Sequence, residues 1–181
     1  TCLKEFGMRP IPYCNSLGLL QPGSTFFHVV HADDYDMELL GEGRCAVVHN
    51  PASNMKLASG VAPIGTFNNY RIPVGLGTDG PASNNAQNMF REMYVASLLQ
   101  KVHTLEPTAC PAQLALDLAT RGGADALHFP QIGTLEPGMK ADFIAVDLSS
   151  PNMQPVHNIV SNIVYAATGA ENRLTVVDGK E

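Results

Sequence analysis

The residues best suited to chemistry lie at 77–80, where the sequence GTDG follows an apolar run over 72–77 that we predict to be a strand. An aspartate at the carboxyl end of a parallel strand lies at the edge of the sheet where β/α proteins assemble their sites. The two glycines let the backbone turn sharply beside Asp79 without a Cβ clash. Asp79 is therefore either a loop residue that caps the backbone or a carboxylate that binds a metal or transfers a proton.

Two histidines, His28 and His31, lie at the end of another predicted strand over 24–30, which is rich in β-branched and aromatic residues and is expected to be buried. Side chains alternate along a strand, so we expect His28 on the face of Phe26 and Val30, and His31 in the loop beyond. Because an odd spacing flips the face, the His-x-x-His pattern does not by itself predict a zinc site. Each histidine is either a hydrogen-bonded structural residue or part of a site.

A third polar segment begins at His49, the last residue of a predicted strand over 45–49. Asn50 and Pro51 are expected to break this strand and to begin a long polar loop over 50–60. The asparagine and serine side chains either hold the shape of that loop through local turns or form a pocket wall. The sequence contains no P-loop and no G-x-S-x-G or H-E-x-x-H motif, and it lacks the cytidine-deaminase zinc signature.

The elements that must position these residues alternate between strand and helix, which predicts an α/β fold with a parallel sheet. Asp33 is placed to cap a helix over 34–42, in which Met37 and Leu40 face inward and Gly43 marks the end.

Further helices are predicted at four places, over residues 10–18, 63–70, 87–101 and 111–120. The pair Gly122-Gly123 is expected to stop the last of these. One apolar face of the helix over 87–101 is expected to carry Phe90, Met93, Tyr94 and Leu98.

Beyond Pro130 the pattern changes, because strands are predicted without long helices between them, over 141–147, 162–166 and 174–177. We therefore place a domain boundary there, with a β/α domain over 1–130 and a mostly β domain over 131–181. A complete (β/α)8 barrel needs about 250 residues, so the three predicted strands of the first domain cannot close one. The sequence stops after a predicted Asp178-Gly179 turn without a returning strand, and we expect it to be an internal piece of a longer protein.

Composition limits the classes of partner. Hydrophobic residues make up 45% of the 181 residues and charged residues 15%, which suits a folded core. The formal net charge of −6 argues against a nucleic-acid or anionic-membrane partner, since both need a basic face. No apolar run approaches the roughly 18–20 residues of a membrane span. Four scattered cysteines without a C-x-x-C pair indicate free thiols in a reducing, cytoplasmic setting.

Taken together, these segments resemble the amidohydrolase superfamily, and among its members the 5-methylthioadenosine/S-adenosylhomocysteine deaminases and their triazine-hydrolase relatives. The resemblance spans nearly the whole chain. Its matching segments are residues 28–31 (HVVH), 49–60 (HNPASNMKLASG), 75–80 (GLGTDG), 83–85 (SNN), 89–93 (MFREM), 133–142 (GTLEPGMKAD) and 154–156 (QPV).

This resemblance implies a metal-dependent (β/α)8 barrel flanked by a small β-sandwich. Residues 1–130 would be the last third of the barrel, strands six to eight, and residues 131–181 part of the sandwich. Asp79 matches the strand-eight aspartate that binds zinc and shuttles a proton. His28 matches the strand-six histidine that contacts the attacking hydroxide or the substrate, and it is preferred to His31 because the family pattern places the functional histidine first.

The implied activity is zinc-dependent hydrolytic deamination of an adenosine-type nucleoside to its inosine analogue in the full-length protein, which could be a homo-oligomer or a monomer. The alternatives are a triazine chlorohydrolase or guanine deaminase of the same superfamily, and a non-catalytic fragment. The family's His-x-His of strand one and His-x-x-Glu of strand five have no match in the sequence. Catalytic zinc normally has three or more protein ligands, so we expect this chain alone to be inactive.

Overall fold

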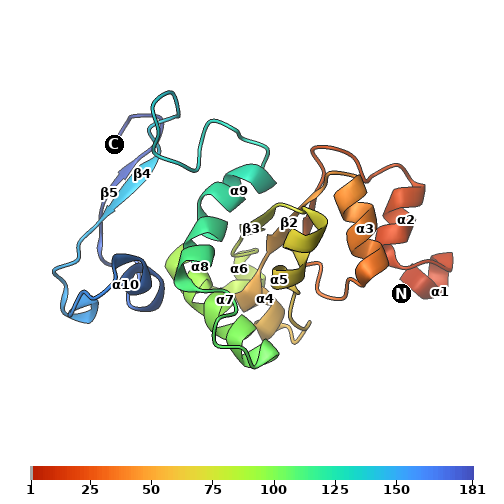
Figure 1. The fold of residues 1–181 in the computed structure, drawn as a ribbon, viewed down its shortest axis with the longest axis horizontal. Coiled ribbons are helices and arrows are strands. Elements are labelled where there is room, and N and C mark those ends of the chain that lie inside the picture. Colours follow the sequence, from red (N-terminus) through yellow and green to blue (C-terminus); the bar gives the residue numbers. More distant parts are fainter. Residues whose placement is uncertain (1) are drawn as a thin grey trace.

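A parallel three-stranded sheet forms the centre of the protein (Figure 1). The computed structural model describes residues 2–181. The strands β1 (Thr25–Phe27), β2 (Ala46–His49) and β3 (Val74–Leu76) are hydrogen-bonded in the order β1-β2-β3. Both pairs are parallel, with Phe26 beside Val47 and His49 beside Leu76. The predicted α/β class and parallel sheet are therefore confirmed.

Helix α3 (Asp34–Glu42) connects β1 to β2 and follows the prediction closely. The Asp33 side chain accepts a hydrogen bond from the backbone N–H of Asp36, and the Asp36 side chain accepts one from the backbone N–H of Asp33, so a capping box begins the helix. Met37 and Leu40 are buried and Gly43 is the C-cap. Local signals were enough here because caps act within one helical turn.

The two faces of the sheet are covered differently. Val47 and Leu76 share one face and belong to the main core with Phe67 of helix α5 (Ile64–Phe67). Ala46 and Val48 point to the other face, where they pack on Ala126. This second face therefore has a small apolar patch instead of a deep core.

Helix α9 (Arg121–Ala126) covers this second face and begins directly after the predicted helix over 111–120. Helix α8 (Ala112–Ala119) does end before the pair, but a new helix runs through Gly122 and Gly123. A Cβ on Gly122 would lie 2.3 Å from the carbonyl oxygen of Val74. Glycine is needed there because α9 approaches the backbone of β3 closely.

The predicted strand over 24–30 is wrong in its length and burial. β1 ends at Phe27, which is 59% exposed on the open edge of the sheet. His28 and Val29 have φ of 70° and 42°, outside the extended region. The alternation that placed His28 with Phe26 and Val30 therefore does not apply.

Two other assignments are also corrected. The predicted loop over 50–60 contains helix α4 (Pro51–Lys56), because proline is preorganised for the first helical position. The predicted strand over 162–166 is helix α10 (Ile159–Tyr165), whose cap Asn158 accepts a hydrogen bond from the backbone N–H of Ser161. α10 packs against α8 and against helix α7 (Met89–Thr104).

Helix α7 has a different buried face from the predicted one. Met93 is buried, but Tyr94 and Leu98 are 43% and 41% exposed. The other buried positions include three polar residues, which are Glu92, Ser97 and Gln100. Polar burial on this scale requires hydrogen-bond partners, and for Glu92 these lie in the site described below.

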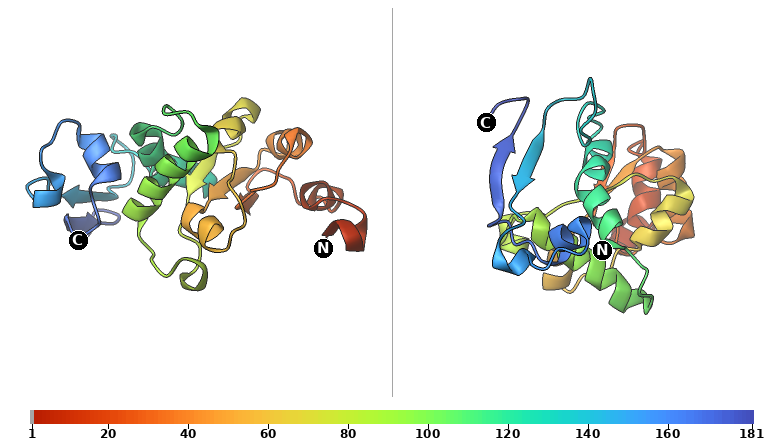
Figure 2. Two further views of the ribbon diagram at one scale, coloured as in Figure 1. Left: turned by 90° about the horizontal axis from the view of Figure 1, so that it is seen from below. Right: turned by 60° about the vertical axis from the view of Figure 1, so that its left-hand side comes forward.

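A separate antiparallel sheet pairs β4 (Phe143–Val146) with β5 (Asn172–Val176). It lies at the opposite end of the molecule from helices α1 (Cys2–Phe6) and α2 (Pro10–Ser16) (Figures 1 and 2). The remaining elements are helix α6 (Pro81–Asn84) and two 3-10 turns, Asn68–Tyr70 and Pro151–Met153. Within residues 2–181, no helix is long and apolar enough to cross a membrane.

Candidate active site

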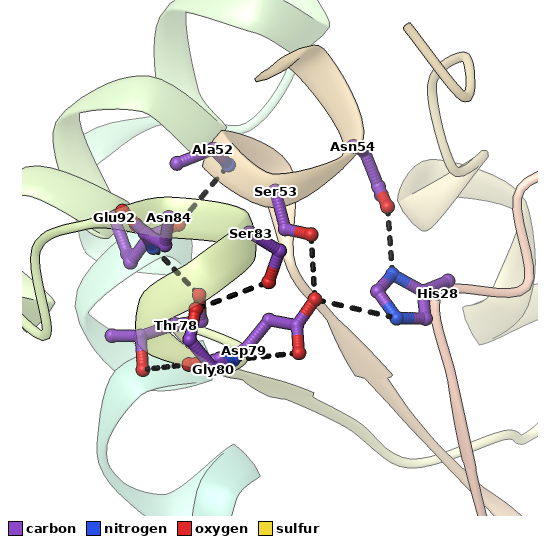
Figure 3. Close-up of polar contacts among 10 residues, drawn as sticks. All are labelled: His28, Ala52, Ser53, Asn54, Thr78, Asp79, Gly80, Ser83, Asn84 and Glu92. Atoms are coloured by element: carbon purple, nitrogen blue, oxygen red, sulfur yellow. Dashed lines mark hydrogen bonds and ion pairs between the residues drawn. The ribbon is translucent and has the colours of Figure 1, made fainter. Parts of the chain in front are cut away.

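Three polar segments converge at the carboxyl ends of the parallel strands. His28 follows β1, Asp79 follows β3, and helix α4, which follows β2, carries Ser53 and Asn54 (Figure 3). Nε2 of His28 lies 3.8 Å from Oδ2 of Asp79. The structure thus brings the two predicted site residues together, and the resemblance alone had singled out this pair.

The Asp79 carboxylate is held by short hydrogen bonds on both oxygens. The Ser53 hydroxyl donates to Oδ2 at 2.6 Å, and the backbone N–H of Gly80 donates to Oδ1 at 2.6 Å. The Ser53 hydroxyl above all, followed by the Ser83 hydroxyl and the Gly80 N–H, lowers the pKa of Asp79 from 3.8 to about 2. The side chain is 31% exposed, so an ionised carboxylate at neutral pH remains open to a metal or a substrate.

The His28 imidazole is oriented by Asn54. Nδ1 of His28 lies 2.7 Å from Oδ1 of Asn54. A carbonyl oxygen only accepts, so Nδ1 carries the proton and Nε2 is the nitrogen that faces Asp79. The imidazole is 39% exposed. In its neutral form, His28 therefore presents an acceptor nitrogen to the space beside Asp79.

A cavity of about 750 Å³ opens beside this pair. His28, His31 and Asp79 all line it, so His31 is at the site as well, although it has no polar contact with Asp79. Arg9 lines another wall and forms ion pairs with Asp33 and with the buried Asp36. These ion pairs fix helix α2 against α3, which gives the cavity a defined shape on that side.

His49 is buried next to the site but is not part of it. Its side chain is 0% exposed, and neither ring nitrogen has a hydrogen-bond partner. Burial chiefly, with a contribution from the charge of His28, lowers the pKa of His49 from 6.5 to about 4. His49 is therefore neutral at physiological pH.

The residues that sequence reasoning missed are the buried supports of the site. Asn84 and Glu92 are 4% and 0% exposed and hydrogen-bond to each other at 2.7 Å. Both lie in segments that carried the resemblance, but neither was assigned a role. A carboxylate at a buried helix position is the signal that could have identified Glu92.

The side chains of Asp79 and His28 are suitable ligands for one side of a metal site. A carboxylate oxygen of Asp79 and a neutral imidazole nitrogen of His28 are both donors that zinc accepts. The hydrogen bond from Nδ1 of His28 to Asn54 is the kind of outer contact that orients a functional imidazole. Among residues 2–181, however, no group of three or more His, Cys, Asp or Glu side chains converges on one point. A complete zinc site would need ligands from outside this chain.

Comparison with known proteins gives a consistent result. The amidohydrolase family profile matches residues 2–181. A 5-methylthioadenosine/S-adenosylhomocysteine deaminase of Nitratidesulfovibrio vulgaris (strain Miyazaki F) is 54% identical over 179 residues, covering 99% of this chain. An adenosine deaminase of Xanthomonas campestris, solved with bound zinc, superposes with a TM-score of 0.95 at 37% identity. The atrazine chlorohydrolase of Arthrobacter aurescens, complexed with zinc, superposes with a TM-score of 0.93 at 27% identity.

In each comparison this chain covers only part of the other protein. It spans 41% of the Nitratidesulfovibrio deaminase. In the two structural superpositions, 99% of this chain is aligned. The aligned part makes up 41% of the Xanthomonas enzyme and 40% of the Arthrobacter enzyme.

Proposed function

The chain belongs to the amidohydrolase family, and we propose that it forms the part of a zinc-dependent deaminase that supplies Asp79 and His28 to the active centre. The substrate would be a 5-methylthioadenosine- or S-adenosylhomocysteine-type nucleoside, deaminated to its inosine analogue. The observation that carries this proposal is the 3.8 Å approach of the His28 imidazole to the Asp79 carboxylate at one edge of the sheet.

In this proposal residues 1–130 contribute strands six to eight of a (β/α)8 barrel, and residues 131–181 contribute to a small β-sandwich. The parallel order β1-β2-β3 supports the first assignment, since barrel strands are parallel and sequential. The separate antiparallel pair β4-β5 supports the second. β1 and β3 would then be paired on their open edges by strands from elsewhere in the full protein.

Zinc bound at this site would lower the pKa of a coordinated water from about 15.7 toward about 7. Asp79 would be one of its ligands, and its low pKa keeps the carboxylate ionised for that purpose. The remaining ligands would come from outside this chain. For this reason we expect the 181-residue chain alone to bind little zinc and to show no turnover.

Asp79 would also carry the proton. Addition of a water oxygen to C6 of the purine releases one proton, which the Asp79 carboxylate accepts. The addition also opens the C6–N1 double bond and leaves its electron pair on N1. When the C6–N6 bond breaks, Asp79 returns its proton to the departing nitrogen, which leaves as ammonia, and the proton still on the C6 oxygen passes to N1 to give the inosine-type product. The carboxylate ends the cycle ionised, as it began.

His28 would stabilise the attacking oxygen. With Nδ1 held by Asn54, Nε2 is directed at the space in which the oxygen adds to C6. There Nε2 accepts a hydrogen bond from the O–H of the attacking oxygen, which holds that oxygen in line with C6 of the ring.

The test uses a hybrid protein in which the N-terminal part of the Nitratidesulfovibrio deaminase precedes this chain. We expect ammonia release from 5-methylthioadenosine, and loss of that release in the hybrid carrying Asp79→Asn with an unchanged circular-dichroism spectrum. The proposal is wrong if the Asp79→Asn hybrid keeps a near-normal rate.

The same hybrid separates the substrate classes. Assays with guanine and with atrazine, the latter read as chloride release, test the two alternatives within the family. Preferential chloride release from atrazine would replace the nucleoside assignment with a triazine hydrolase. The isolated 181-residue chain, assayed in parallel and analysed for zinc, tests the expectation that it is inactive alone.

A further inference from the structure

Helix α7 buries a carboxylate on its core-facing side. Glu92 is 0% exposed, and its neighbours Met93 and Ala96 on the same helix are buried and apolar. Among residues 2–181, none of the ion pairs includes Glu92. A buried charge without an ionic partner is unfavourable unless hydrogen bonds satisfy it. An apolar residue would suit this position better if packing were its only role.

One oxygen of Glu92 caps the N-terminus of helix α4. Oε2 accepts a hydrogen bond from the backbone N–H of Ala52 at 3.2 Å. Asn50, at the N-cap, makes no side-chain cap hydrogen bond, and Pro51 has no N–H. Glu92, a residue of helix α7, therefore supplies the N-terminal cap that the local sequence of α4 does not provide. Helix α4 is the element that carries Ser53 and Asn54.

The other oxygen of Glu92 reaches the loop of Asp79. Oε1 accepts a hydrogen bond from Nδ2 of Asn84 at 2.7 Å, and the same nitrogen donates to the carbonyl oxygen of Thr78 at 2.6 Å (Figure 3). Thr78 directly precedes Asp79. The amide of Asn84 thus links the carboxylate to the backbone of the catalytic loop.

We propose that Glu92 is a positioning residue that sets the loop of Asp79 at a fixed distance from helix α4, and through it the geometry between Asp79 and His28. It touches neither substrate nor metal in this proposal. One of its oxygens holds the helix that orients His28 through Asn54, and the other holds the loop that carries Asp79. The proposal rests on the proposed function only for its effect on turnover, because the geometry can be measured without activity.

The chemistry of this link makes Glu92→Gln a selective change. Both neighbours of the Asn84 amide nitrogen, Glu92 and the Thr78 carbonyl, are acceptors, so the nitrogen must face them. In Glu92→Gln the new side-chain oxygen can still accept from Ala52. The new amide nitrogen then faces Asn84, and a flip of Asn84 that satisfies it directs an oxygen at the Thr78 carbonyl. A terminal amide has one acceptor oxygen where the carboxylate has two, so Glu92→Gln keeps only one of the two contacts. In the orientation that keeps the cap of α4, the link to the Asp79 loop is broken.

The test is made by NMR on the 181-residue chain. In Glu92→Gln we expect the backbone N–H of Gly80, which donates to Asp79, to shift and to exchange at least about tenfold faster. The Nδ1–H signal of His28 should stay, because α4 remains capped. An unchanged Gly80 signal would show that Glu92 is only a core residue and would overturn the proposal.

Two further variants make the result independent of folding failure. Asn84→Ala removes the link to Thr78 but leaves Glu92 and its bond from Ala52, so it must also move the Gly80 signal. Gln100→Glu is the matched control, because Gln100 is likewise buried on α7 but donates to the Ala62 carbonyl, which lies outside the site. Even if this control lowers the stability of the chain, the Gly80 signal should not move. A shift as large as in Glu92→Gln would mean that both variants report a general loosening, and would overturn the proposal.

Kinetics of the hybrid protein provide a second readout. A misplaced Asp79 should lower kcat about 10- to 100-fold with little change in KM, since binding of the nucleoside does not depend on Asn84. If the unaltered hybrid is inactive, the proposed function fails while the NMR test of Glu92 still stands. If the hybrid is active and Glu92→Gln raises only KM, the positioning role is wrong and the function is kept.

Discussion

Oδ2 of Asp79 accepts a hydrogen bond from the Ser53 hydroxyl at 2.6 Å and lies 3.8 Å from Nε2 of His28. One carboxylate oxygen is therefore shared between a fixed donor on α4 and the imidazole that follows β1. The arrangement links all three strand ends, because the residues that meet there come from the segments after β1, β2 and β3. A change at any one of them should be detectable at the other two.

Ser53→Ala should raise the pKa of Asp79 from about 2 toward 3.8, because the Ser53 hydroxyl is the largest contributor to its lowering. The effects of the Ser83 hydroxyl and of the Gly80 N–H remain, so the return to 3.8 should be incomplete. Carboxyl carbon NMR of the 181-residue chain measures the titration. Ser59→Ala is the control, since Ser59 is exposed on the same stretch of chain. An unchanged titration in Ser53→Ala would remove Ser53 from the site.

Asn54→Ala should shift the tautomer of neutral His28. In the native chain the Asn54 carbonyl keeps the proton on Nδ1, and without it the Nε2–H tautomer, usually preferred in water, should become populated. Nitrogen-15 shifts of the imidazole at pH above 8 report the two forms. Asn54→Asp retains an acceptor oxygen and should keep the native tautomer. Equal spectra for Asn54→Ala and the native chain would contradict the orientation of His28 described above.

The sequence predicts those parts of the fold that local interactions decide. The helix capped by Asp33 has its cap, its inward residues and its end within three turns, so the pattern was sufficient. The parallel order of the sheet follows from the alternation of elements. Asp79 was predicted at a strand end for the same reason, although only the resemblance decided between a structural and a catalytic role.

Residues that depend on distant contacts could not be predicted in this way. Helix α10 was mistaken for a strand because its β-branched residues suit both forms, and its packing on α7 and α8 decides between them. Helix α4 is capped by Glu92, which lies 40 residues away in sequence. The left-handed backbone at His28 likewise depends on contacts beyond its own strand.

His49 should make stability depend on pH. Its pKa is 6.5 when unfolded and about 4 when folded, so the unfolded state binds the extra proton between these values. The contribution is fully present above about pH 6.5 and is lost progressively as the pH falls to about 4, by about 3 kcal/mol at most. Urea unfolding at pH 7.5, 6, 5 and 4.5 measures it.

A neutral side chain of similar size identifies the source of that dependence. His49→Gln should be less sensitive to acid over this range than the native chain, although its stability at pH 7.5 will be lower if the new amide is not satisfied. His157→Gln, which alters an exposed imidazole, should leave the dependence as it was. A native-like acid dependence in His49→Gln would assign it to other groups.

Substitution by alanine at the two adjacent glycines of α9, Gly122 and Gly123, should have different effects on the stability of the chain. A Cβ on Gly122 would lie 2.3 Å from the Val74 carbonyl oxygen and 3.1 Å from that of Asp117, and both are backbone atoms that cannot move aside. Gly122→Ala should therefore push α9 off β3 and destabilise the chain by roughly 1–3 kcal/mol.

At Gly123 the nearest atom to a new Cβ, the Leu118 carbonyl oxygen, is 3.9 Å away, which is an ordinary contact. Gly123→Ala should be neutral or stabilising by up to about 1 kcal/mol, because alanine favours a helix interior. Midpoints of urea unfolding compare the two variants under one condition. The two changes are identical in chemistry and one residue apart. Equal midpoints would therefore mean that α9 does not pack on β3 as described.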